Sequence, residues 1–258
     1  MFNQLMTFCA LIHRDLWIFS SQLKDRVINA LIWVIITIWV MQYIMPEMGL
    51  AHFGAFMAIS NIASSGFWEV TENVAKFIAD LEGEKTISYY LTLPLSPNLV
   101  FIKIAITNAI QAMIICCIMF PMAVFVVGSD FNYAHVAWGK TLVLFVLAHL
   151  FYGFFSLYLC TVVTSMDKLS NLYMRYTFPM WFLGSYQFTW AAFYKTFPVL
   201  ACINLLNPMT YCMEGLRDAT LGTQGSLSFG VCSVALILFI LFFGWFGIHS
   251  LKKRLDCA

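Results

Sequence analysis

The sequence predicts an all-α integral membrane protein with six transmembrane helices, an N-terminal interfacial helix, a cytoplasmic surface helix and a re-entrant helix pair before the last span. Of the 258 residues, 61% are hydrophobic and only 10% are charged, whereas a soluble domain carries about 25% charged residues. The mean hydropathy of +0.82 agrees with this class. These values exclude a soluble enzyme and a disordered chain, and a net charge of +1 leaves no basic surface for nucleic acid.

The first 23 residues predict a helix that lies along the membrane surface. Their apolar side chains recur near a helical period, and Asn3, Gln4, Arg14 and Asp15 fall between them. A helix with one apolar and one polar face suits the interface between lipid and water. We therefore expect residues 1–23 to form an interfacial helix that precedes the first span.

Six apolar runs are long enough to cross a bilayer, for which about 20 residues are needed. The first run ends before Pro46, and the second contains small and polar residues such as Ser60, Asn61 and Gly66. Small residues allow helix backbones to approach closely, so we expect the second span in the interior of the bundle. The predicted spans are Val27–Met45, Phe53–Val74, Asn98–Val127, His135–Thr164, Leu172–Ala192 and Phe229–Ser250.

The Lys and Arg residues predict the orientation of the chain. With six spans and a cytoplasmic N-terminus, eleven of the 14 lie on or near the cytoplasmic side, and the others are Lys140, Lys195 and Arg217. Cytoplasmic loops of membrane proteins carry an excess of Lys and Arg. Both termini are therefore expected in the cytoplasm.

Patterns typical of catalytic and metal sites are scarce. The eight cysteines form no Cys-x-x-Cys pair, and the five histidines form no His-Glu-x-x-His motif. The tripeptide Gly139-Lys140-Thr141 lacks the upstream glycine of a phosphate-binding loop. His149 is interpreted as an interior histidine with hydrogen-bond partners. Cys202 and Cys212 are interpreted as free thiols, with a disulfide as the alternative in an oxidising compartment. We expect no enzyme and no bound cofactor.

Glu69 and Glu72 lie three residues apart near the end of the second predicted span. Carboxylates inside a membrane are typical of proton- or ion-coupled proteins, whereas carboxylates at the end of a span are commonly solvated. We favour the solvated helix end. An ion-coupled secondary transporter remains the alternative function.

The segment 76–97, between the second and third predicted spans, predicts an amphipathic surface helix. It begins with charged residues, continues with apolar ones and is broken at Pro94; Ser96 and Pro97 would then start the third span as N-cap and first helical residue. Such a helix can transmit the push of a partner into the bundle, and a long loop is the simpler alternative. The residues singled out are Asp80, Glu82, Glu84, Thr86, Ile87, Tyr90, Leu91 and Pro94.

Residues 193–226 are too short and interrupted for a span, yet too apolar for an ordinary loop. A re-entrant pair of short helices shielded by protein satisfies both properties. Asn207-Pro208 is expected to end one of these helices, and Pro208→Ala to impair function more than Arg217→Ala. Glu214 and Arg217 are expected to pair near the outer surface. The residues singled out are Asn207, Pro208, Tyr211, Glu214 and Arg217.

At these two segments the sequence resembles the permease subunits of type-2 ATP-binding-cassette exporters. In the first segment Thr86, Leu91, Pro94 and Ser96 match the family pattern, whereas Lys85 and Ser88 replace its Gly and Glu. In the second, Phe197-Pro198, Leu205 to Tyr211 and Glu214 to Arg217 are similar to the family signature Asn-Pro-Leu-Thr-Tyr and its surroundings. The resemblance covers essentially the whole chain, so that residues 1–258 are expected to form a single permease domain.

The resemblance implies the membrane subunit of an exporter in a bacterial inner (cytoplasmic) membrane. It implies a homodimer, with the first and fifth spans at its interface, and two separately encoded ATPase subunits, which use ATP and Mg²⁺, docked on the coupling segment 76–97. The implied mechanism is alternating access for an amphiphilic substrate: a lipid, a glycolipid or glycan, or a drug-like molecule. The aromatic residues between Trp181 and Tyr194 are interpreted as an interfacial belt, with stacking on sugars as the alternative. A structural membrane scaffold is a further alternative function.

Overall fold

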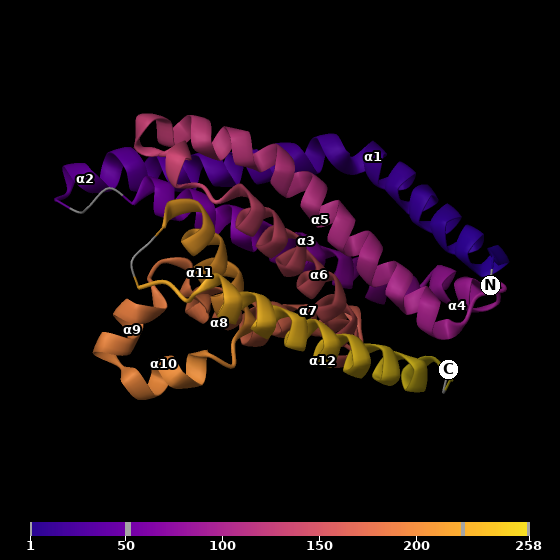
Figure 1. The fold of residues 1–258 in the computed structure, drawn as a ribbon. Helices are drawn as coiled ribbons and strands as arrows, with labels where there is room; N and C mark the ends of the chain where they lie inside the picture. The colour runs from indigo at the N-terminus through magenta and orange to yellow at the C-terminus, as the bar shows by residue number, and fades with distance from the viewer. Residues whose placement is uncertain (1, 50–52, 223–224, 257–258) are drawn as a thin grey trace.

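Helices account for the regular structure in the described part of the chain, residues 2–49, 53–222 and 225–256 of the computed structural model (Figure 1). The long helices are α1 (Phe2–Trp39), α3 (Gly54–Glu82), α5 (Pro97–Val127), α6 (Trp138–Val162) and α12 (Phe229–Asp256). The short ones are α2 (Met45–Glu47), α4 (Thr86–Leu91), α7 (Leu169–Leu172), α8 (Phe178–Trp181), α9 (Trp190–Thr196), α10 (Pro198–Asn204) and α11 (Pro208–Leu221). The π-helical turns η1 (Val40–Ile44), η5 (Tyr173–Thr177) and η6 (Phe182–Tyr186) join some of them.

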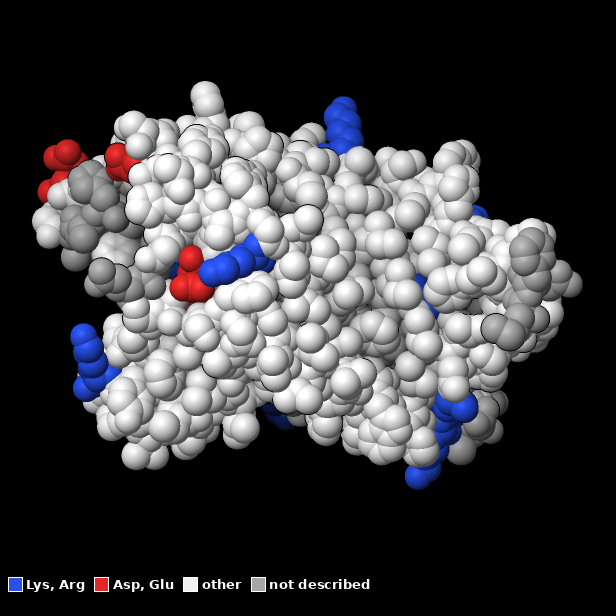
Figure 2. All heavy atoms as spheres, viewed as in Figure 1, with Lys and Arg blue, Asp and Glu red and all other residues white. Residues whose placement is uncertain are grey.

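Within the described residues, four helical stretches are long and apolar enough to cross a membrane: Gln4–Glu47, Pro97–Asp130, Trp138–Val162 and Phe229–Leu255. Much of their apolar surface is not buried inside the protein. The most apolar windows of the first and the last stretch are only 17% and 22% buried. Figure 2 shows a face on which charged side chains lie mostly at the margins. These properties identify an all-α integral membrane protein.

The first helix differs from the expectation of a separate interfacial helix. Residues 2–39 form one continuous helix, and η1 and α2 extend it to Glu47. The reason is local, because residues 2–45 contain no glycine or proline that would end a helix. At about 1.5 Å per residue the helix is about twice as long as the roughly 30 Å hydrocarbon core. Figure 1 shows it changing direction part-way.

Helix α3 takes the interior position expected for the second span. It contacts α1, α5, α6 and α11, and Ser60, Asn61, Ser64 and Gly66 are among its buried residues. Because these side chains are polar or small, α3 is not one of the four apolar stretches. It also continues past Val74 to Glu82, so that residues 75–82 belong to the end of this helix and not to the expected surface helix.

The expected fifth span, Leu172–Ala192, is not one continuous helix. It consists of the end of α7, then η5, α8 and η6, and the start of α9. The chain turns within η6 at Gly184 and Ser185, whose backbones leave the helical conformation. Ser185 has a φ of 66°, which lies in the left-handed region that residues other than glycine seldom adopt. The backbone peptide groups at this break therefore need hydrogen-bond partners from outside their own helix.

Three helices, α9, α10 and α11, occupy residues 190–221 in place of the expected pair. Pro198 and Pro208 each stand at the start of a helix, where proline is tolerated because the N–H it lacks has no partner within the helix. Helix α11 packs on α3, α6 and α12 and against η6. The segment is therefore helical, as expected, but with one helix more. Helix α11 is the part that packs on the bundle, whereas α9 and α10 contact mainly each other and are largely exposed.

Both chain ends and α4 lie at one end of the bundle, and α2, α9 and α10 lie at the other (Figure 1). Between them α12 packs along α6, and α1 along α5. The segments singled out from the sequence therefore lie at opposite ends of the molecule.

Candidate functional site

Helix α11 begins at the motif Asn207-Pro208. The side-chain oxygen of Asn207 accepts a hydrogen bond from the backbone N–H of Met209 (3.1 Å), and its amide donates to the carbonyl of Met180 (2.7 Å). Asn207 is therefore the N-cap of α11, and Pro208 is its first residue. The expectation that this motif ends a helix is wrong, since α10 already ends at Asn204.

Hydrogen bonds also connect α11 to the end of α10. The hydroxyl of Tyr211 donates to the carbonyl of Leu205 (2.8 Å), and the amide of Asn204 donates to the hydroxyl of Thr210 (3.1 Å). The motif therefore holds a tight helix–helix corner.

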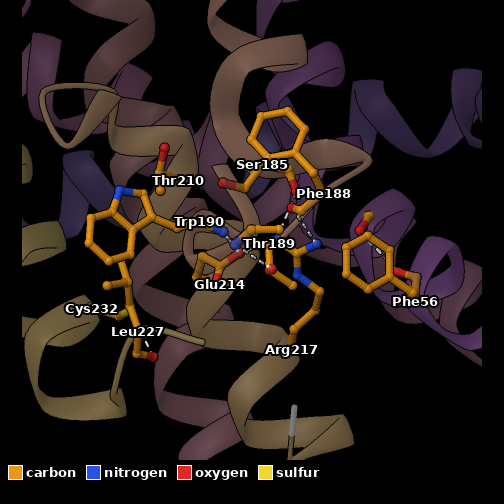
Figure 3. A network of polar contacts seen from close by, with 12 residues as sticks. Phe56, Ser185, Phe188, Thr189, Trp190, Thr210, Glu214, Arg217, Leu227 and Cys232 are labelled. Atoms are coloured by element: carbon orange, nitrogen blue, oxygen red, sulfur yellow. Dashed lines mark hydrogen bonds and ion pairs between the residues drawn. The ribbon is translucent and has the colours of Figure 1, made fainter. Parts of the chain in front are cut away.

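Glu214 and Arg217 form a fully buried ion pair on α11 (Figure 3). Nη2 of Arg217 lies 2.7 Å from Oε1 of Glu214 and donates to the carbonyl of Ser185 at 2.7 Å. Nη1 donates to the carbonyl of Phe188 (3.2 Å), and Oε1 of Glu214 accepts from the backbone N–H of Trp190 (3.0 Å). The expected pairing is present, but the expected exposed position is wrong because neither side chain has exposed surface.

This network supplies hydrogen-bond donors to the backbone of the broken fifth segment. The carbonyls of Ser185, in the turn of η6, and of Phe188, just after it, receive their donors from Arg217. Non-helical backbone is tolerated within a membrane protein only where the protein satisfies it. The packing is close, since a Cβ on Gly184 would lie 2.4 Å from Cβ of Met209. Arg217 therefore joins α11 to the break.

The coupling segment folds as a short helix with a capped start. Helix α3 includes Asp80 and Glu82, the chain turns with Lys85 in the left-handed region (φ 56°), and α4 begins only at Thr86. The carboxylate of Asp80 accepts the backbone N–H groups of Thr86 and Ile87, both at 3.0 Å. The acidic residues thus precede the surface helix, contrary to the expectation that they form its first turn, and Asp80 caps it from α3.

The two faces of α4 differ in burial. Ile87 and Tyr90 are each only 6% exposed, and Leu91 is partly buried, whereas Ser88 and Tyr89 are exposed on the other face. The helix is therefore amphipathic, as the sequence predicts, and its apolar residues pack on the bundle.

The ring of Tyr90 is held by charged groups from two long helices. The guanidinium of Arg14 on α1 lies 5.0 Å from the ring centroid, and the ammonium of Lys103 on α5 lies 4.7 Å from it. Lys103 is 1% exposed and forms an ion pair with Asp15. Tyr90 therefore connects α4 to both α1 and α5.

The remaining acidic residues and Pro94 lie at the surface around α4. Glu84 is exposed in the turn after α3, and Glu82 accepts a hydrogen bond from the backbone N–H of Met166 (3.1 Å). Pro94 lies in the turn before α5, which starts at Pro97 as predicted. Ser96 stands at the N-cap position with an extended backbone, but its side chain makes no capping hydrogen bond.

A cavity of about 400 Å³ lies among α1, α3, α5 and α8. Arg26 of α1 and Glu69 of α3 form an ion pair at its wall, with side chains 10% and 9% exposed. The interpretation of Glu69 as a solvated helix end is therefore wrong, although Glu72, on the same wall, is exposed. Trp33, Trp68 and Trp181 form another part of the wall.

The aromatic belt expected between Trp181 and Tyr194 is only partly present. Trp181 and Tyr186 are buried, with ring centroids 4.2 Å apart, and the hydroxyl of Tyr186 donates to Asn61 (2.9 Å). Phe182 and Tyr194 are 48% and 45% exposed. The first two rings belong to the core, and the other two face outward.

His149 has the satisfied interior role expected of it. It is buried, its Nδ1 lies 2.7 Å from the carbonyl of Phe145, and its Nε2 lies 3.0 Å from the Sγ of Cys116. Cys202 and Cys212 are free thiols, one exposed and one buried. Among the described residues no group of three or more His, Cys, Asp and Glu side chains could hold a metal ion.

Sequence reasoning missed the pairs Asp15–Lys103 and Arg26–Glu69. Each joins residues from different helices, so no helical spacing relates them. Glu69 alone gave a signal, as a carboxylate near a span. The strained turn at Ser185 gave none beyond the neighbouring glycine.

No protein-family model matches the chain, and no curated protein matches it.

Proposed function

We propose that the chain is the membrane-spanning subunit of an ATP-driven exporter, working as a homodimer with two separate ATPase subunits. The proposal places its six membrane segments in a bacterial inner membrane with both termini in the cytoplasm. It rests on one geometrical observation, the attachment of α4. The family resemblance of the sequence motifs gives this geometry its functional meaning.

Helix α4 is attached to three long helices at one end of the bundle. Asp80 ties its first residues to the end of α3, and Tyr90 ties its last turn to α1 and α5. Ser88 and Tyr89 remain exposed for a partner. A push on the exposed face would therefore move the three helices together.

The mechanism follows from this attachment. Closure of the ATPases on ATP would press α4, and the movement of α1, α3 and α5 would open a pathway between protomers to the other side. An amphiphilic substrate would leave the cytoplasm by this pathway. The chain supplies the coupling helix and the pathway, and the partner supplies ATP hydrolysis with Mg²⁺.

An ion-coupled carrier is less well supported. It would require a buried carboxylate that is free to bind and release its ion. The buried Glu69 is held by Arg26, and Glu72, which makes no such pair, is exposed. Releasing Glu69 would break the ion pair of a guanidinium that is only 10% exposed, which is costly.

The test is purification of the tagged full-length chain from its native membrane with its associated proteins. We expect an ATPase to co-purify, and its activity to depend on α4. Tyr90→Ala and Thr86→Pro should abolish stimulated ATP hydrolysis in a complex that still inserts in the membrane, and Glu82→Ala should do much less. A cysteine at Ser88 should crosslink to the ATPase in a nucleotide-dependent way.

The two disruptive variants act on different attachments of α4. Tyr90→Ala removes the ring that Arg14 and Lys103 hold. Thr86→Pro removes the N–H that Asp80 accepts, and it places a proline after Lys85, whose left-handed backbone is disfavoured before proline. Because Thr86 is the first residue of α4, the proline acts on the start of the helix and does not interrupt it.

Two controls match the change at Tyr90. Tyr90→Phe keeps the buried ring between the two cations, so it should retain stimulated hydrolysis. Tyr133→Ala removes a ring of the same kind from a position that is 57% exposed after α5, and it should leave the complex unaffected. Intact assembly and transport in Thr86→Pro would show that α4 does not couple the two subunits. Absence of any associated ATPase from an otherwise active transporter would contradict the proposed function itself.

A further inference from the structure

The cavity among α1, α3, α5 and α8 has the size and wall of a ligand site. Its volume of about 400 Å³ lies within the roughly 300–1,000 Å³ usual for small-molecule pockets. Aromatic side chains from separate helices form much of the wall: Trp33 of α1, Trp68 of α3, and Phe178 and Trp181 of α8. The cavity therefore offers aromatic surface to an occupant.

The rings are held in place by their contacts with one another. The ring of Trp68 meets those of Phe178 and Trp181 edge-on, with centroids 5.2 and 5.4 Å apart. The indole N–H of Trp33 donates to Asn61 (3.2 Å). A pre-formed aromatic wall binds without first having to be ordered.

The charges of the cavity favour a cation. Arg26 is paired with Glu69, and its guanidinium also lies over the ring of Phe19, 5.3 Å from the centroid. Glu72 lines the same cavity and interacts with the charge of Arg26, but it makes no hydrogen bond or ion pair with any described residue. One guanidinium and two carboxylates leave a net charge of −1 beside three indoles.

We propose that this cavity binds an organic cation with an apolar body, such as a lipophilic ammonium or phosphonium ion. The charge would lie near Glu72 and the indole faces, where cation–π attraction is strongest for tryptophan. The apolar body would occupy the remainder of the cavity, beside Ile115 and Met119. Binding of the cation does not depend on the proposed function. Only its role as the transported substrate rests on that proposal.

The test is binding to the purified full-length chain in lipid nanodiscs, without ATP or ATPase. Radiolabelled tetraphenylphosphonium is the probe, and tetraphenylborate, of nearly the same size and shape but opposite charge, is its matched control. Bound label is counted above that of empty nanodiscs. We expect saturable binding of the phosphonium ion and none of the borate.

Three variants locate the bound probe. Glu72→Gln should weaken phosphonium binding about ten-fold, equivalent to about 1.4 kcal/mol. Glu47→Gln changes the same charge at an exposed position of α2, outside the cavity, and should leave binding unchanged. Trp68→Phe should weaken binding less than Glu72→Gln, because it keeps an aromatic face.

Absence of saturable phosphonium binding by the folded chain would overturn the inference, as would equal binding of the borate. Unchanged affinity of Glu72→Gln for the phosphonium ion would show that the probe binds elsewhere, and this result would also overturn the inference. None of these results affects the ATPase experiment, so the inference and the proposed function can fail separately.

Discussion

Replacing Arg217 by alanine removes the donor that connects α11 to the broken fifth segment. The substitution leaves Glu214 buried without its cation, and the carbonyls of Ser185 and Phe188 without their donors. Breaking a buried ion pair by removing one partner costs about 3–5 kcal/mol. Hydrogen bonds within membrane proteins contribute about 0.6 kcal/mol each on average, so the two carbonyls add about 1 kcal/mol. We therefore expect Arg217→Ala to lower the free energy of unfolding by about 4–6 kcal/mol.

The measurement is reversible unfolding of the purified chain in mixed micelles, followed by tryptophan fluorescence. Arg217→Lys keeps the charge but loses the planar fork that reaches both carbonyls, and should fall between wild type and Arg217→Ala. Glu214→Gln with Arg217→Met removes both charges, and should recover part of the loss because no unpaired ion remains. Arg175→Ala is the control, since Arg175 is exposed.

A loss below about 1 kcal/mol in Arg217→Ala, or equal effects at Arg217 and Arg175, would refute the buried-network argument. The sequence-based expectation ranked Pro208→Ala as the more harmful change. For stability we expect the opposite order, because alanine is well tolerated at the first position of a helix whereas a buried guanidinium has no substitute.

Three further predictions concern separate parts of the chain. Gly184→Ala should destabilise the protein by about 1–3 kcal/mol, because the new Cβ meets Met209, whereas Gly139→Ala, with no atom within 4 Å of its Cβ, should not; thermal unfolding in detergent compares the two, and equal melting points would contradict the close approach. Asn207→Ala should cost about 1 kcal/mol through loss of the N-cap, measured in the same way, and an unchanged melting point would show that the cap contributes nothing. With the other cysteines replaced, Cys257, which lies outside the described residues, should be labelled from the cytoplasmic side and Asn132→Cys from the outside; labelling of Cys257 only from outside would overturn the proposed topology.

The sequence was sufficient to predict what depends on local chemistry. Long apolar runs predicted the membrane class, Pro97 predicted the start of α5, and Ile87 and Tyr90 predicted the apolar face of α4. These features depend on residues close together in the chain. Where the prediction failed locally, as at the continuous α1, the expected boundary had no glycine or proline behind it.

Burial and pairing between distant residues could not be predicted in the same way. Spacing alone related Glu214 to Arg217, but not to Trp190, Ser185 or Phe188, whose backbones make the pair a buried network. The turn at Ser185 creates the need for these bonds, and only the folded chain shows it. The exposed position assigned to the pair was wrong for this reason.

Polar contacts also explain how α1 and its extension η1 are attached to the bundle. Asp15 pairs with Lys103 of α5, Arg26 pairs with Glu69 of α3, and the amide of Gln42 donates to Asp130 after α5. Lipid is as apolar as a leucine side chain, so apolar burial gives little drive for helix association within it. Polar contacts at three positions along the helix therefore fix how it packs on the bundle, which the apolar surface of α1 cannot do. One of these contacts lies beside Tyr90 and another lines the cavity. In the mechanism that we propose, α1 is therefore the helix through which a displacement of α4 would be transmitted to the cavity wall.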